Sequence, residues 1–263
     1  MVSKPAIPLE TLHGQWCDAI TAAFGEELSP VDDAAPGYEH TYSAGEGTDR
    51  RLVVICPWHW PAYSHYQFWE LAAVPWLARR AGYRDWCLLT NGAWTDWILP
   101  ALRPLYGAVI VADEPPIDIL GTWLQADPAP ISLPPDRPPG RIQLGEPTPK
   151  QTTVTLKQAI ADVLGGDART GRKLPTRLVV ATLRPNFSLD DDRTLIFAKS
   201  FRNPDVAHEA KMLASRALLC PDGTRPIVVI DGRWRDAPDL IASVGADVCT
   251  ADQLSKLRRQ GDG

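Results

Sequence analysis

Apolar residues recur every three or four positions near the start of the chain, which is the spacing of one face of an α-helix. The residues on this face are Leu12, Trp16, Ile20, Ala23 and Phe24. Because Gly25 follows directly, the pattern predicts an amphipathic helix over residues 11–24 that ends at the glycine.

Short apolar runs bounded by Gly, Asp and Asn predict strands. In the first half of the chain they cover residues 38–43, 51–56, 86–90 and 108–112. The first two runs flank Ala-Gly-Glu-Gly-Thr-Asp, whose glycines permit the turn of a hairpin. Helical stretches at 66–81 and 94–106 separate the later strands, and we expect Pro75 and Pro100 to kink or shorten them.

The second half of the chain repeats this order of elements. The predicted helices cover residues 156–164, 206–219 and 237–244, and the predicted strands cover 177–183, 194–199, 226–230 and 247–250. Each half therefore runs helix, hairpin, helix, strand, helix, strand. This order predicts an α/β fold made of two tandem repeats of a mixed-sheet unit with helices on its faces.

Residue matches between the two halves indicate an internal duplication. Residues 88–96 and 228–236 share the pattern apolar-apolar-x-(Asn/Asp)-Gly-x-Trp-x-Asp, and residues 49–54 match 192–197. We expect one ancestral unit to have given rise to both halves.

A proline-rich stretch at residues 125–150 separates the two halves. Closely spaced prolines remove backbone donors and favour an extended chain, so the stretch predicts a semi-rigid linker. The predicted domains are a first α/β repeat at 10–124 and a second at 151–259.

Composition favours a soluble, cytoplasmic protein. The chain has 263 residues, of which 44% are hydrophobic and 22% charged. It shows neither a secretory signal pattern nor an apolar run of the roughly 20 residues that a membrane span needs, so no membrane partner is expected. The five cysteines lack C-x-x-C spacing, which favours buried free thiols over a metal site.

Charge is divided unevenly along the chain. Residues 150–263 hold 18 Lys and Arg against 14 Asp and Glu, whereas residues 1–149 carry a net charge of −9. A polyanion such as DNA would therefore meet the second half first. The cations with which we expect it to bind phosphates are Arg172, Lys173, Arg177, Arg202, Arg233 and Arg235.

The order of elements, with Lys199 at the end of a hairpin strand, resembles the restriction-endonuclease-like (PD-(D/E)XK) fold, especially its Mrr-like branch. Thr-Asn-Gly-Ala-Trp at 90–94 and Ala-Asp-Gln-Leu at 251–254 also resemble the end of that unit. The resemblance implies that an active member holds a divalent metal with an Asp and a Glu or Gln, and that a Lys follows two positions after the second.

Measured against this pattern, both repeats are degenerate. Lys199 takes the Lys position, but Phe197 stands at the Glu position, and Ala181 or Thr182 stands where the Asp is expected. Asp190 and Asp192 could act with Lys199 only if the hairpin folds back. In the first repeat, Cys56 and Val54 take the corresponding places. The nearby Glu209-Ala210-Lys211 lies in a predicted helix, where residues two apart diverge, so we interpret it as surface charge.

An aromatic cluster just after the strand at 51–56 is a second candidate site. Its proposed ligand-binding residues are Trp58, His59, Trp60, Tyr63 and His65. Flat rings beyond the carboxyl end of a strand suit the stacking of a base or a sugar. The alternative is that these rings fill the core or pack the two units together.

Three functions remain open from the sequence. The leading hypothesis is a nucleic-acid-binding or assembly component with a degenerate endonuclease-like fold, for instance in restriction, defence or a mobile element. The alternatives are an active nuclease that uses Lys199 and the loop aspartates, and a nucleotide- or sugar-binding enzyme or sensor that uses the aromatic cluster. No cofactor is expected, and Mg²⁺ enters only with the nuclease alternative. DNA, a protein partner or a second copy of the chain are the expected partners.

Overall fold

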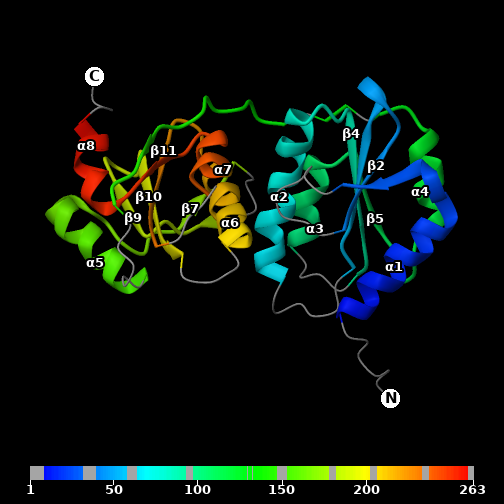
Figure 1. Cartoon of the computed structure of the whole chain (residues 1–263), viewed down its shortest axis with the longest axis horizontal. Coiled ribbons are helices and arrows are strands. Elements are labelled where there is room, and N and C mark those ends of the chain that lie inside the picture. The colour runs from blue at the N-terminus through cyan, green and yellow to red at the C-terminus, as the bar shows by residue number, and fades with distance from the viewer. Residues whose placement is uncertain are drawn as a thin grey trace, which may run out of the picture. The chain divides into compact units, whose positions relative to one another are not determined.

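The computed structural model of the chain divides into two compact units, Met1–Leu133 (unit 1) and Pro134–Gly263 (unit 2). The residues that the structure describes are 9–31, 40–57, 64–92, 97–128, 130–131, 133–146, 153–177, 182–201, 206–232 and 237–259. Each unit is an α/β sheet with helices on both faces, which confirms the α/β part of the predicted fold class (Figure 1).

Unit 1 is built on a five-stranded mixed sheet. Its elements are α1 (Leu9–Phe24), β1 (Leu28–Pro30), β2 (Thr41–Ala44), β3 (Arg51–Ile55), α2 (Ser64–Arg80), β4 (Asp85–Thr90), α3 (Ile98–Leu102), β5 (Ala108–Val111) and α4 (Ile117–Gln125). The strand order is β1-β2-β3-β4-β5. The first three strands are antiparallel neighbours, and β3, β4 and β5 run parallel.

Helices cover both faces of this sheet because its central strands are apolar on both sides. Trp16 and Ile20 of α1 and Leu120 of α4 pack on Val53 and Leu89 in one buried cluster. On the other side of the sheet lie α2 and α3 (Figure 1). The sequence-predicted amphipathic helix at 11–24 is confirmed by α1.

Unit 2 has a second five-stranded mixed sheet and a small two-stranded one. Its elements are β6 (Ile142–Gln143), α5 (Thr153–Leu164), β7 (Leu174–Pro175), β8 (Thr182–Leu183), β9 (Phe187–Leu189), β10 (Thr194–Phe201), α6 (Val206–Leu218), β11 (Arg225–Gly232), α7 (Ala237–Ser243), β12 (Asp247–Cys249) and α8 (Leu254–Arg259). The main sheet has the order β6-β12-β11-β10-β9, and β7 pairs only with β8. Only the β9–β10 pair of the main sheet is antiparallel.

The two sheets share a strand register. In unit 1, Leu52 of β3 lies beside Trp86 of β4, and in unit 2, Leu195 of β10 lies beside Pro226 of β11. The residue matches between the two halves align Leu52 with Leu195 and Trp86 with Pro226. The structural register thus agrees with the residue matches, while the duplication itself stays a prediction.

Several predicted elements differ from the observed ones. Residues 178–181 of the strand predicted at 177–183 lie outside the described residues, and residues 182–183 form β8, which pairs with β7 in the small sheet. The antiparallel partner of β10 is β9, which lies between the predicted strands 177–183 and 194–199. The helix predicted at 94–106 is helical at 98–102 with one 3-10 turn after it, whereas α2 continues through Pro75.

The proline-rich stretch contributes to unit 2 from residue 134 onward. Its residues 142–143 form β6, which pairs with β12, although the whole stretch was predicted to be a semi-rigid linker. The guanidinium of Arg137 donates to the backbone carbonyls of Ala217, Cys220 and Pro221 at the end of α6. These bonds fasten the stretch to unit 2, so that half of it is not a free linker.

The cysteines behave as small apolar residues. Cys56, Cys87, Cys220 and Cys249 are buried free thiols, and Cys17 is half-buried. Burial raises the pKa of Cys220 and Cys249 to about 12. Among the described helices, none has the length and apolar character needed to cross a bilayer.

Candidate functional site

Lys199 lies near the carboxyl end of β10, and its side chain faces α6. Its Nζ is 2.5 Å from Oε1 of Glu209, and the two side chains are 29% and 15% exposed. Our interpretation of Glu209 as surface charge is therefore wrong, because the helix turns this carboxylate onto the sheet. Among the described residues, Oε2 of Glu209 has no hydrogen-bond partner. A half-buried ion pair of this kind is less screened than a surface pair.

Asn186 is a polar residue just before β9, the antiparallel neighbour of β10. It stands between Pro185 and β9, and its Oδ1 accepts a hydrogen bond of 2.6 Å from the backbone N–H of Ala198. Thr182, which we had placed at the expected Asp position, lies in the β7–β8 sheet instead. The Asn186 amide therefore binds the backbone of β10 one residue before Lys199.

Asp190 and Asp192 do not join Lys199. They lie in the β9–β10 turn at the opposite end of β10, five residues of strand away, which is about 17 Å at about 3.3 Å per residue. The turn has left-handed backbone at three consecutive aspartates, Asp190, Asp191 and Asp192. Asp192 is 2.8 Å from Arg172, and Asp191 is 3.2 Å from Arg169. These carboxylates close the hairpin and bind the preceding arginines.

The residues around Lys199 fit a divalent metal poorly. Mg²⁺ prefers several oxygen ligands that include carboxylates, and here Glu209 is already paired with Lys199. Phe197, at the expected Glu position, is buried in the core. Within the described ranges, no three His, Cys, Asp or Glu side chains form a group that could hold a metal ion.

A cavity of about 560 Å³ opens on the other face of the unit 2 sheet. Asp231 lies beside Ser200 on the neighbouring strand and is buried, so its side chain faces away from Lys199. Asp231, Thr250 and Asp252 line the cavity together with Glu146 and two apolar residues of α5. The Thr250 hydroxyl donates to Asp252 and lowers the pKa of that carboxyl. Such an acidic cavity attracts cations and repels phosphate.

Sequence reasoning missed Asp231 as a cavity residue, because the Asp-Gly step in its motif was interpreted only as part of the repeat. The position of Asp231 in its strand could have identified it. The motif places Asp231 at the carboxyl end of a parallel strand, where α/β sheets commonly bind ligands.

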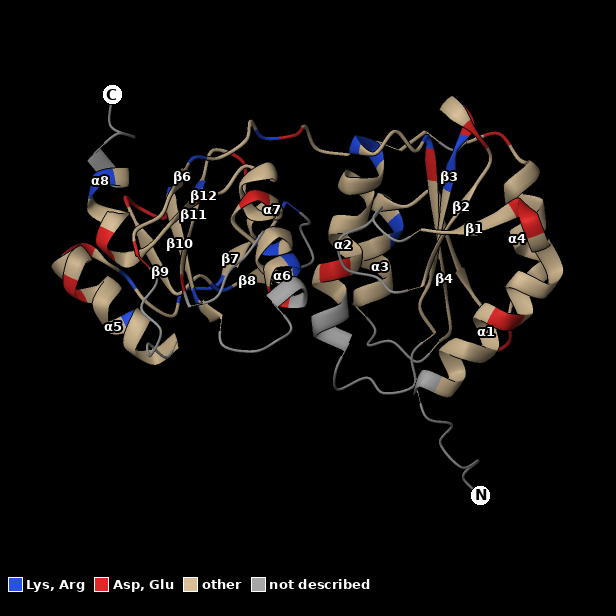
Figure 2. Ribbon diagram, viewed as in Figure 1, with Lys and Arg blue, Asp and Glu red and all other residues tan. Residues whose placement is uncertain are grey.

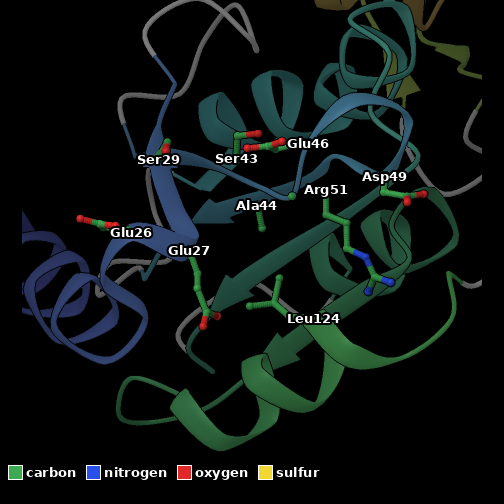
Figure 3. Close-up of a pocket in the computed structure, with 10 residues that line it drawn as sticks. Glu26, Glu27, Ser29, Ser43, Ala44, Glu46, Asp49, Arg51 and Leu124 are labelled. Carbon is green, nitrogen blue, oxygen red and sulfur yellow. The ribbon is translucent and has the colours of Figure 1, made fainter.

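Unit 1 has a polar cavity of about 440 Å³ around Arg51 (Figure 3). The carboxylates of Glu26, Glu27, Glu46 and Asp49 belong to its lining. Arg51 is buried, and its guanidinium donates to the backbone oxygens of Trp123 and Ala126 at the end of α4. The cation therefore joins β3 to α4, and we assign this cavity a structural role.

At the unit 1 position that matches Lys199 stands Cys56, which is fully buried. Its backbone oxygen accepts a 2.6 Å hydrogen bond from the Thr90 hydroxyl. The next residue, Pro57, accepts a 2.7 Å hydrogen bond from Nε2 of His13. These contacts fix the carboxyl end of β3 and place no cation there.

The predicted phosphate-binding residues have different surroundings. The Arg177 side chain is only 4% exposed and pairs with Asp222 at 2.6 Å, so the prediction that it contacts phosphate is wrong. It also donates to the backbone oxygen of Pro135. Arg172 is half-exposed and paired with Asp192, and Lys173 is exposed. Arg202, Arg233 and Arg235 lie outside the described residues.

The aromatic cluster lies largely outside the described residues. This holds for Trp58, His59, Trp60 and Tyr63, and for the side chain of His65. Of the rings that follow, Phe68 is fully buried and makes edge contacts with Trp69 at 5.3 Å and Trp97 at 4.9 Å between ring centroids. The described part of the segment therefore contributes to the core of unit 1.

Comparisons with protein-family models, curated proteins and solved structures found no match to this chain.

Proposed function

We propose that this protein binds nucleic acid through unit 2, on an endonuclease-like framework whose metal site is incomplete. The observation that carries the proposal is the environment of Lys199. A lysine at the position expected for an endonuclease-like strand is already paired with the carboxylate of Glu209, and the Asn186 amide binds the backbone of the preceding residue, Ala198. These side chains can bind a phosphate or stabilise the packing of α6 on β10. They lack the carboxylate ligands that metal-dependent hydrolysis requires.

The arrangement of elements supports this framework. Each unit contains a helix, an antiparallel strand pair, a second helix and a parallel strand, in the order on which the resemblance rests. A fold hosts many functions, so the framework alone selects none of them. The charge of unit 2 provides the second argument.

Exposed cations of unit 2 gather on the segments around β7, β8 and the β9–β10 turn (Figure 2). They are Arg169, Arg172, Lys173, Arg184 and Arg193. The Arg169–Asp191 pair is largely exposed to solvent and contributes little to stability, so a phosphate can replace the carboxylate. Clustered cations favour nucleic-acid binding, and here phosphates would compete with Asp191 and Asp192 for the arginines.

Fluorescence anisotropy with labelled duplex and single-stranded DNA tests the proposal. We expect the full chain to bind in the absence of metal, with affinity that falls steeply as salt rises. The double substitution Lys173→Glu/Arg184→Glu should weaken binding and reduce the slope of log K against log salt by about 2, because each phosphate contact contributes about 0.9. Arg103→Glu, an exposed cation of unit 1, is the matched control and should leave binding unchanged.

Two outcomes would overturn the proposal. An absence of binding at low salt would remove the nucleic-acid function altogether. Mg²⁺-dependent cleavage that is lost in Lys199→Ala and in Glu209→Gln would show that the site is complete in another form, and the protein would then be a nuclease.

A further inference from the structure

Among the described residues, the strand β5 forms the outer, apolar edge of the unit 1 sheet. Its four residues, Ala-Val-Ile-Val, contain neither charge nor proline, the devices that usually protect an edge strand. Val111 is 38% exposed, and Ala108 and Val109 are half-buried. Among the described residues, no strand lies beyond β5 in the sheet.

The corresponding strand of unit 2 is covered. All three residues of β12 are buried, and β6 runs parallel to it on its outer side. The backbone N–H of Val248 donates to Arg141, and that of Thr250 donates to Gln143. An extended segment of this chain thus completes one sheet, and the equivalent place in unit 1 has no such segment among the described residues.

A groove of about 400 Å³ follows this edge strand. Ala108 and Ile110 of β5 form one wall, and Ile119, Thr122 and Trp123 of α4 belong to the other. The groove lining is mostly apolar, and Ile119 is 54% exposed. An extended peptide that adds to a sheet edge makes backbone hydrogen bonds and directs alternate side chains to one face. In unit 1, the side chains on one face of such a peptide would enter the groove.

Charge decides which peptide suits this edge. The exposed carboxylates Asp113, Glu114 and Asp118 lie just beyond the carboxyl end of β5 and at the start of α4. A peptide parallel to β5, in the orientation that β6 has on β12, would bring its own carboxyl end to these acids. We propose that the β5 edge binds an extended segment of a partner protein, apolar at alternate positions and ending in Lys or Arg.

The test uses the full chain and a fluorescein-labelled peptide, Gly-Arg-Ile-Gln-Leu-Gly-Lys-Lys, which extends residues 140–145 of this chain by two lysines. We expect saturable binding by anisotropy with a Kd on the order of 100 μM or tighter. Thr122→Arg, which fills the groove and repels the basic end, should weaken binding about tenfold or more. Val154→Arg, a similarly placed change on an exposed helix residue of unit 2, should have no effect. A peptide with proline in place of the glutamine should not bind, because the residue equivalent to Gln143 of β6 would lack the N–H that faces the neighbouring strand.

An absence of peptide binding, or binding that Thr122→Arg leaves unchanged, would overturn the proposal. Concentration-dependent self-association in sedimentation experiments, abolished by Thr122→Arg, would instead assign the edge to a second copy of the chain. None of these outcomes depends on nucleic-acid binding, which involves the other unit.

Discussion

Asp85 is a fully buried carboxylate at the start of β4. Its Oδ1 accepts a 2.8 Å hydrogen bond from the backbone N–H of Trp86, whereas Oδ2 has no partner among the described residues. The neighbouring strand passes so close that a Cβ on Gly107 would lie 1.9 Å from Oδ1. Burial raises the pKa of Asp85, although the Trp86 N–H, Arg51 and Arg84 partly oppose this. Charged Asp85 therefore costs unit 1 stability.

Asp85→Asn should stabilise the protein at neutral pH, because it keeps the shape and removes the buried charge. A carboxyl with a raised folded-state pKa stabilises the fold below its unfolded pKa of about 3.9, and this contribution is lost as pH rises through the folded-state pKa. The melting temperatures of wild type and variant should thus diverge as pH rises from 4 to 8. A difference that is constant with pH, or a less stable variant at pH 7, would contradict this account.

The sequence predicted the place of a single residue where that place depends only on the neighbouring residues in the chain. The place of Lys199 near the end of β10 was predicted from the apolar run before it, while its role in a site stays a prediction. Glu209 was misinterpreted because its partner comes from another element, and only the packing of α6 on β10 brings the two charges together. Arg177 was misassigned for the same reason: its burial depends on Asp222 and Pro135, which are distant in the sequence.

Among the elements, strands with continuous apolar runs were predicted well, because a buried strand is apolar on both faces. The prediction of β10 and β11 rests on such runs. The strand β9 was missed because its three residues are followed at once by three aspartates, a combination typical of loops. The small β6 was missed because prolines surround it. Its stability comes from β12 and from Arg137, neither of which is visible in the local pattern.

Arg137→Ala should destabilise unit 2 by about 1–3 kcal/mol, because it leaves the Cys220 carbonyl without its donor. The carbonyls of Ala217 and Pro221 keep other donors, which are the N–H of Cys220 and the N–H and hydroxyl of Thr224. Nine of the ten tryptophans lie in unit 1, so fluorescence follows unit 1 while circular dichroism follows both units. The substitution should lower the midpoint by circular dichroism and leave the fluorescence midpoint in place.

Arg141→Ala is the matched control for Arg137→Ala. Its side chain is 44% exposed and 3.6 Å from Asp247, a geometry that contributes at most about 1 kcal/mol. Equal losses in the two variants would show that the carbonyl contacts of Arg137 are not the source of stability.

For the molecule as a whole, the order of elements gave the α/β class and the presence of two units. The position of the boundary between the units could not be predicted from the sequence. Composition alone does not distinguish a free proline-rich linker from one that is bound to a unit along its length. The structure divides the chain between Leu133 and Pro134, ahead of Arg137 and β6.

A comparison of two fragments tests the observed boundary. Residues 134–263 retain β6 and Arg137 and should fold with a cooperative thermal transition. Residues 151–263, the fragment nearest to the sequence-predicted repeat, lose both features and expose β12, so they should melt at lower temperature or aggregate. Equal melting temperatures for the two fragments would mean that residues 134–150 add nothing to unit 2.

The pairing of β6 with β12 also determines when the sheet of unit 2 can be completed during synthesis. Ile142 and its partner Val248 lie at opposite ends of unit 2 in the sequence. At about 5–20 residues per second, a ribosome needs about 5–20 s to make the intervening chain. During that interval the segment that becomes β6 has left the ribosome without its neighbour. Unit 2 therefore completes its sheet late, and a chaperone that holds extended chains has its best opportunity before β12 emerges.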